Sequence, residues 1–159
     1  MVEHSTEPRI DTLSFQLGMI NCFVEMVACG VKRMAISPPL TPDEYARIES
    51  ASSKIVGAFG MLSHLEKSLL LTDLQTEEFT KGKWSVLYYR DRETLDAYFA
   101  LKERKNKLEE LGQYGELERK DVSRAFMRLL SYPDKVIDAK LSQTEPTNPF
   151  VLSENREES

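Results

Sequence analysis

The sequence predicts a mainly α-helical fold: a bundle of four main helices with a short fifth helix, and room for a small two-stranded β-ribbon. Apolar residues recur every three or four positions through most of the chain, as they do along one face of a helix. Capping residues and helix stops separate these stretches. One short segment alone carries the β-branched and aromatic residues typical of a strand.

The first predicted helix begins at Asp11 or Thr12, either of which can cap it, and runs to about Arg33. Its apolar positions have helical spacing: Leu13, Leu17, Ile20, Val24, Val27 and Val31. The Ser37-Pro38-Pro39 segment ends this helix, because proline cannot continue it.

The second predicted helix has the clearest start signal in the chain. Thr41 and Glu44 have the spacing of a capping box, and Pro42 occupies the first helical position, where its missing N–H costs nothing. The apolar period continues to about Leu71. Gly57 and Gly60 interrupt it, which indicates either close contact with another helix or a break into two helices.

The only predicted strand is 84–89, Trp-Ser-Val-Leu-Tyr-Tyr, because this segment is rich in β-branched and aromatic residues. A strand needs a partner, and the nearest candidate is the apolar segment 69–72. We therefore expect a small hairpin over 69–89 if a sheet forms at all.

Three helices are predicted in the C-terminal half, over about 91–112, 116–130 and 133–140. Asp91 can cap the first of them and Gly112 can end it. Pro133 separates the other two, since the residue before a proline disfavours helical geometry.

The domain organisation follows from this pattern. We expect a flexible leader over 1–10, a single helical domain over 11–141 and a polar, flexible tail over 142–159. The tail contains one apolar segment, Phe150-Val151-Leu152.

Charge and cysteine usage narrow the classes of function. The net charge is −5, so no general attraction to nucleic acid or to an anionic membrane is expected. The apolar stretch 17–36 contains Glu25, Lys32 and Arg33, which argues against a membrane span. No signal peptide is evident, and Cys22 and Cys29 lie about 10 Å apart along one helix, beyond disulfide reach. These features predict a cytoplasmic protein with reduced thiols.

The most noticeable candidate cluster for a metal site is formed by Cys22, Glu25 and Cys29, which share one side of the first predicted helix. They could ligate a metal if His64 joined them from the second helix. The favoured interpretation is that both cysteines are small core residues, because their spacing matches no tight chelating pair. No metal or other cofactor is therefore predicted.

Glu25 and His64 are the candidate catalytic residues. A carboxylate in so apolar a helix is costly unless it is exposed or paired, and a raised pKa would suit it to acid–base chemistry. An ion pair with Arg47 or Lys54 would make it structural instead. His64 is the one histidine outside the leader, and a polar-face position is its favoured interpretation.

Strong catalytic and nucleotide-binding motifs are absent. The sequence has no phosphate-binding glycine loop, no His-Glu-x-x-His and no Gly-x-Ser-x-Gly. The basic run 102–107 is interpreted as a solvated helix face, because Glu103 with Lys107 and Lys105 with Glu109 form i, i+4 pairs.

The segment 126–133, Phe-Met-Arg-Leu-Leu-Ser-Tyr-Pro, resembles a helix-then-Tyr-Pro sequence of small uncharacterised prokaryotic protein families, and this resemblance implies no activity.

The leading interpretation is a protein-interaction or self-assembly module without catalysis, with a protein partner or a second copy bound to exposed apolar surface. The alternative is a small-molecule or metal-binding protein, or an enzyme, with its site between the first two helices.

Overall fold

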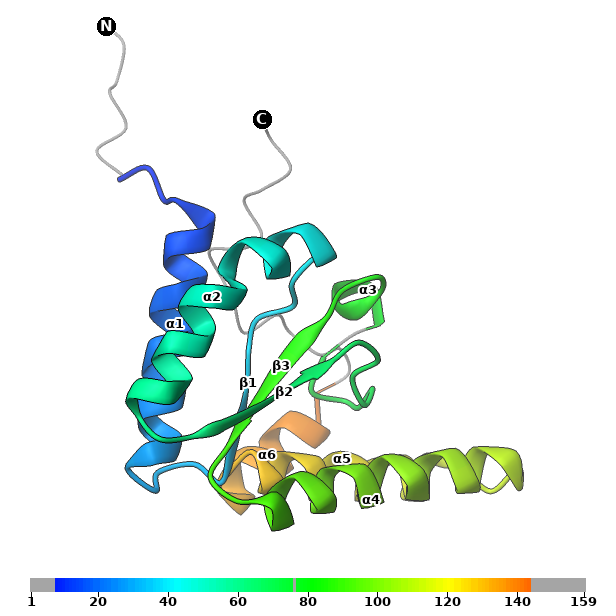
Figure 1. The fold of residues 1–159 in the computed structure, drawn as a ribbon. Coiled ribbons are helices and arrows are strands. Elements are labelled where there is room, and N and C mark those ends of the chain that lie inside the picture. Colours follow the sequence, from blue (N-terminus) through cyan, green and yellow to red (C-terminus); the bar gives the residue numbers. More distant parts are fainter. Residues whose placement is uncertain (1–7, 76, 144–159) are drawn as a thin grey trace, which may run out of the picture.

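A computed structural model of the chain describes residues 8–75 and 77–143 and shows helices on both faces of a small sheet (Figure 1). The helices are α1 (Thr12–Ala28), α2 (Pro42–Ala58), α3 (Glu77–Thr80), α4 (Arg92–Glu110), α5 (Glu116–Leu129) and α6 (Asp134–Leu141). The strands are β1 (Met34–Ile36), β2 (Leu62–Glu66) and β3 (Ser85–Tyr89).

The three strands form one antiparallel sheet in the order β1-β3-β2. Tyr89 at the end of β3 is opposite Met34 on one side and Leu62 on the other. All five residues of β3 are buried, because the strand is paired along both edges and covered on both faces. This accounts for its apolar and aromatic composition.

Successive β3 residues point into two separate cores. Val86 and Tyr88 pack with the apolar stripe of α1 and α2, which includes Ile20, Val24, Val27, Ile48 and Val56. Leu87 and Tyr89 pack with residues of α4, α5 and α6, among them Leu95, Tyr98, Phe126, Met127 and Ile137. The sheet therefore separates an α1–α2 layer from an α4–α6 layer.

The prediction of a helical bundle is wrong, because a three-stranded antiparallel sheet runs through the middle of the molecule. The predicted second helix ends at Ala58, since Gly60 takes a left-handed φ of +65° and the chain leaves the helix. Residues 62–66, predicted to be helical, then extend along β3 as β2.

The predicted hairpin partner of the aromatic strand is also wrong. Strand 85–89 forms as expected, but it pairs with β1 and β2 and not with 69–72. The first helix ends at Ala28, earlier than predicted, and Met34 begins β1. Three residues are too few to show the alternating pattern of a strand, so the sequence does not predict β1.

The local helix signals are confirmed. The Thr41 amide donates to Glu44 Oε2 at 3.0 Å, and the Glu44 amide donates to Thr41 Oγ1 at 3.2 Å. Asp11 and Asp91 cap α1 and α4 through their carboxylates.

Among the described residues, no helix has the length and apolar character needed to cross a membrane. The leader and tail predictions fall mainly on 1–7 and 144–159, outside the described residues.

Candidate functional site

The structure does not place Cys22, Glu25 and Cys29 in a core. Cys22 and Glu25 are exposed on α1 and Cys29 is exposed directly after it, because the buried stripe of that helix is formed by Gln16, Ile20, Val24 and Val27. The interpretation of the two cysteines as core residues is wrong for this reason. Within 8–75 and 77–143, no three His, Cys, Asp or Glu side chains gather in a way that could hold a metal.

His64 lies in β2 and not in a helix. Its ring meets that of Phe99 on α4 edge-on, with the centroids 5.2 Å apart. It therefore faces the α4–α6 layer, whereas Glu25 is on α1, across the sheet. The structure does not bring the two candidate catalytic residues together.

Among the residues that the structure describes, the buried carboxylate is that of Glu66, which is 6% exposed at the end of β2. Its Oε2 accepts hydrogen bonds from Tyr98 Oη and Lys102 Nζ, both at 2.9 Å. Its Oε1 accepts from the Ser68 amide at 3.0 Å. Each carboxylate oxygen therefore has a donor, and the cluster ties β2 to α4.

The pKa of Glu66 is lowered overall. Burial raises it, but the hydrogen bonds from Lys102, Ser68 and Tyr98, with the charge of Lys102, outweigh that effect. Glu66 is consequently ionised and fully paired at neutral pH. A carboxylate in that state is unsuited to exchange protons with a substrate, so we interpret the cluster as structural.

The concave surface with the most distinctive lining lies between α4 and α5. It has a volume of about 400 Å³ and combines three arginines with five apolar residues: Arg33, Arg104 and Arg128 with Ala97, Ala100, Leu101, Ala125 and Leu129. We call it the arginine groove. No carboxylate is among these lining residues, although acidic residues outnumber basic ones, 26 to 21, in the whole chain.

Two hydrogen bonds from the segment before β1 hold Arg33 against the end of α5. The Arg33 amide donates to Ser131 Oγ at 2.8 Å, and Lys32 Nζ donates to the carbonyl of Leu130 at 3.1 Å. Ser131 has a φ of +68°, an uncommon conformation for a residue other than glycine. The contact brings the 30–33 segment beside α5, far from it in the sequence.

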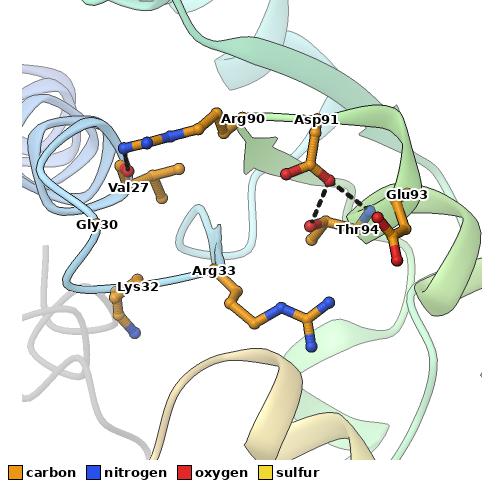
Figure 2. Close-up of a pocket in the computed structure, with 8 residues that line it drawn as sticks. All are labelled: Val27, Gly30, Lys32, Arg33, Arg90, Asp91, Glu93 and Thr94. Atoms are coloured by element: carbon orange, nitrogen blue, oxygen red, sulfur yellow. Dashed lines mark hydrogen bonds between the residues drawn. The ribbon is translucent and has the colours of Figure 1, made fainter.

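A second hollow, the junction pocket, adjoins the groove at Arg33 and has a volume of about 340 Å³. Figure 2 shows its lining residues, which are Val27, Gly30, Lys32, Arg33, Arg90, Asp91, Glu93 and Thr94. It mixes both signs of charge, unlike the arginine groove.

Most charged side chains that line the junction pocket already form hydrogen bonds with other parts of the fold. Arg90 donates to the carbonyls of Val27 and Ala28 at the end of α1, and Asp91 accepts from the amide and hydroxyl of Thr94. The Thr94 hydrogen bonds, with the nearby positive charge of Arg33 and Arg90, lower the pKa of Asp91. In Figure 2, the Arg33 guanidinium extends into the open part of the pocket.

A third hollow, the tip hollow, continues the groove toward the far end of α4. Its lining residues are Ala100, Glu103, Arg104, Lys107, Leu108 and Leu111, and it has a volume of about 340 Å³. Ala100 and Arg104 belong to both hollows, so the concave surface is continuous. It ends beside the helix connection, where Leu111 is 63% exposed and Leu117 is 75% exposed.

The groove arginines are available to a ligand. The guanidinium groups of Arg33 and Arg104 form no hydrogen bond or ion pair with any residue in the described ranges. Arg128 pairs with Asp134 at 3.0 Å, but both side chains are more than half exposed. Exposed pairs contribute at most about 1 kcal/mol, so a ligand carboxylate can replace Asp134.

No family model, curated protein or solved structure matches this chain. Sequence reasoning missed the groove, although one signal was present: Ala97, Ala100 and Arg104 lie at i, i+3 and i+7, on one face of α4.

Proposed function

We propose that this protein is a protein-interaction module without catalysis, and that it binds a partner polypeptide along the arginine groove. The observation that carries the proposal is the lining of the groove: an apolar floor with three arginines, of which Arg33 and Arg104 have no ion pair among the described residues and Arg128 has only the exposed pair with Asp134. Arginine is enriched in protein interfaces, where its planar group binds carboxylates and its stem covers apolar surface.

The continuity of the surface supports a polypeptide over a small molecule. The groove and the tip hollow share Ala100 and Arg104, so the surface follows α4 from Ala97 to Leu111. This is a rise of about 21 Å at about 1.5 Å per residue. Such a length suits a chain segment that contacts several sites at once.

The groove is less suited to nucleic acid. Single strands are held by a row of cations together with aromatic side chains on which bases stack. The floor of the arginine groove is alanine and leucine, and no aromatic residue is among its lining residues. The groove therefore supports polypeptide binding, with carboxylates as the partners of its arginines.

A selection from a random peptide library tests this function while the partner is still unidentified. The full chain is immobilised, and enriched peptides are compared on Ala100→Trp, which fills the groove, and on Ala46→Trp, an exposed alanine of α2 on the other side of the sheet. We expect peptides that lose at least tenfold in affinity on the first variant and none on the second. Enriched peptides that bind both variants equally, or no enrichment, would refute the proposal.

A cytoplasmic location belongs to the same proposal. Cys22 and Cys29 are both exposed, free thiols, which persist in a reducing compartment. Self-assembly is a form of the same function in which the partner is a second copy, and size-exclusion chromatography with light scattering distinguishes it. A dimer that Ala100→Trp dissociates would assign the groove to self-assembly.

A further inference from the structure

We infer that the arginine groove binds an amphipathic α-helix that carries Asp or Glu beside its apolar face. This inference rests on the proposed function and names the chemistry of the partner. Three features of the groove support it: the shape of the floor, the hydrogen-bonding needs of a ligand backbone lying in it, and its charge.

The floor of the groove favours close approach of a helix. α4 and α5 are joined by a short connection and lie side by side (Figure 1). The small side chains of Ala97 and Ala100 come from α4, and Ala125 comes from α5. A third helix can lie between two such helices, with its larger apolar side chains over the alanines and its ridge in the groove.

Backbone hydrogen bonding favours a helix over an extended segment. An extended peptide needs donors and acceptors from a strand edge, because buried backbone groups must be paired. The arginine groove is formed by helix side chains and offers no strand edge. A helix satisfies its own backbone, and about four turns would match the 21 Å between Ala97 and Leu111.

The positive charge of the groove favours acidic residues beside the apolar face of the partner helix. Arg33, Arg104 and Arg128 approach it from three different segments, and the groove's own lining contains no carboxylate. The nearby acidic groups are Asp134, in an exposed ion pair with Arg128, and Asp91, in the adjoining junction pocket near Arg33. Guanidinium groups bind carboxylates through paired hydrogen bonds, which are stronger than neutral ones. Acidic residues three or four positions apart on the partner helix would reach successive arginines.

The probe is a fluorescein-labelled 16-residue helical peptide with Leu and Ala on one face and Glu beside it, and its matched control has Lys at every Glu position. Fluorescence anisotropy with the full chain measures binding. We expect binding of the Glu probe alone, weakening as salt rises. A Glu probe with a central proline should lose at least tenfold, because proline breaks the helix.

The variants locate the interaction. The Arg104→Glu variant should bind the Glu probe at least tenfold more weakly and should bind the Lys probe. Arg47 is an exposed arginine on α2, and Arg47→Glu should change the binding of neither probe. Equal effects of the two variants, or equal binding of the proline probe, would overturn the inference. If groove-dependent peptides are selected from the library but the Glu probe fails, the proposed function stands and this inference alone is lost.

Other occupants are outcomes of the same assay. A chain ending at Gln143 that binds the probe much more tightly would assign the groove to the chain's own segment 144–159, and would overturn the inference of a separate partner. Displacement of the probe by an equimolar single-stranded oligonucleotide would overturn it in favour of nucleic acid. No change on truncation and no displacement would support it.

Discussion

Replacement of Lys102 by methionine tests whether the Glu66 cluster holds β2 and α4 together. Lys102 Nζ lies 2.9 Å from Glu66 Oε2, and the Glu66 side chain is 8% exposed. Methionine keeps most of the volume of the lysine stem but removes its charge. The change therefore leaves a buried carboxylate with the Tyr98 hydroxyl and the Ser68 amide as its remaining donors.

The expected loss in the free energy of unfolding is about 2–3 kcal/mol at pH 7. Breaking a fully buried ion pair costs about 3–5 kcal/mol, and this pair is discounted because the Lys102 side chain is 26% exposed. The result also lies within the range of about 1.5–3 kcal/mol for a hydrogen bond to a charged group. Arg92→Met is the matched control, because Arg92 forms an ion pair with Asp96 that is highly exposed. It should cost less than about 1 kcal/mol.

The loss in the free energy of unfolding caused by Lys102→Met should depend on pH, and the pKa of Glu66 sets the direction of that dependence. This pKa is lowered in the folded protein, so the cluster stabilises the fold above the pKa of an unfolded Glu, about 4.3, and loses that effect as the pH falls through the folded value. The difference between wild type and Lys102→Met should therefore stay constant from pH 7 to about pH 5 and shrink as the pH falls below about 4.3. Urea unfolding followed by circular dichroism measures it at each pH. A deficit equal to that of Arg92→Met, or one that does not change with pH, would refute the reasoning.

Three further outcomes are expected from the same unfolding measurements. Thr41→Ala should cost about 1 kcal/mol because it removes half of the capping box, and Thr41→Ser should restore most of it. Ser131→Ala should cost about 1 kcal/mol through loss of the bond to the Arg33 amide, whereas Ser131→Gly should cost less, because glycine relieves the strain at φ +68°. Burial raises the pKa of Tyr88 to about 12, above that of an unfolded tyrosine near 10, so stability should fall as the pH rises past 10. Tyr88→Phe should show a smaller fall between pH 9 and pH 11, and an equal fall would contradict the assignment.

The helix signals are predictable because they are local. A capping box needs only residues three apart, so Thr41 and Glu44 identify the start of α2 whatever the rest of the fold. The sheet depends on pairs distant in the sequence, such as Met34 with Tyr89. In β2, Leu62 and Leu65 continue the spacing of the preceding helix, and they become strand residues because the chain leaves the helix at Gly60 and β3 supplies hydrogen bonds.

The same limit applies to the candidate site. The sequence presents Glu25 as a carboxylate in an apolar helix, but a helix has an outer face, and Glu25 lies on it. Glu66 has no distinguishing pattern in the sequence, because its burial is created by Tyr98 and Lys102, more than thirty positions away. The basic run 102–107 is likewise not a uniform solvated face: Lys102 and Lys105 bind groups of the 66–71 segment, while Arg104 lines the groove.

The missed strand and the missed groove have one cause. Arg33 immediately precedes β1, and pairing of Met34 with Tyr89 places this segment beside β3 and the start of α4. The Ser131 hydroxyl then fixes the Arg33 amide at the end of α5. Without β1, Arg33 would continue the first helix, as the sequence pattern predicts, and the groove would lose the arginine at its junction end. The antiparallel sheet therefore completes a charge arrangement that no single segment of the chain contains.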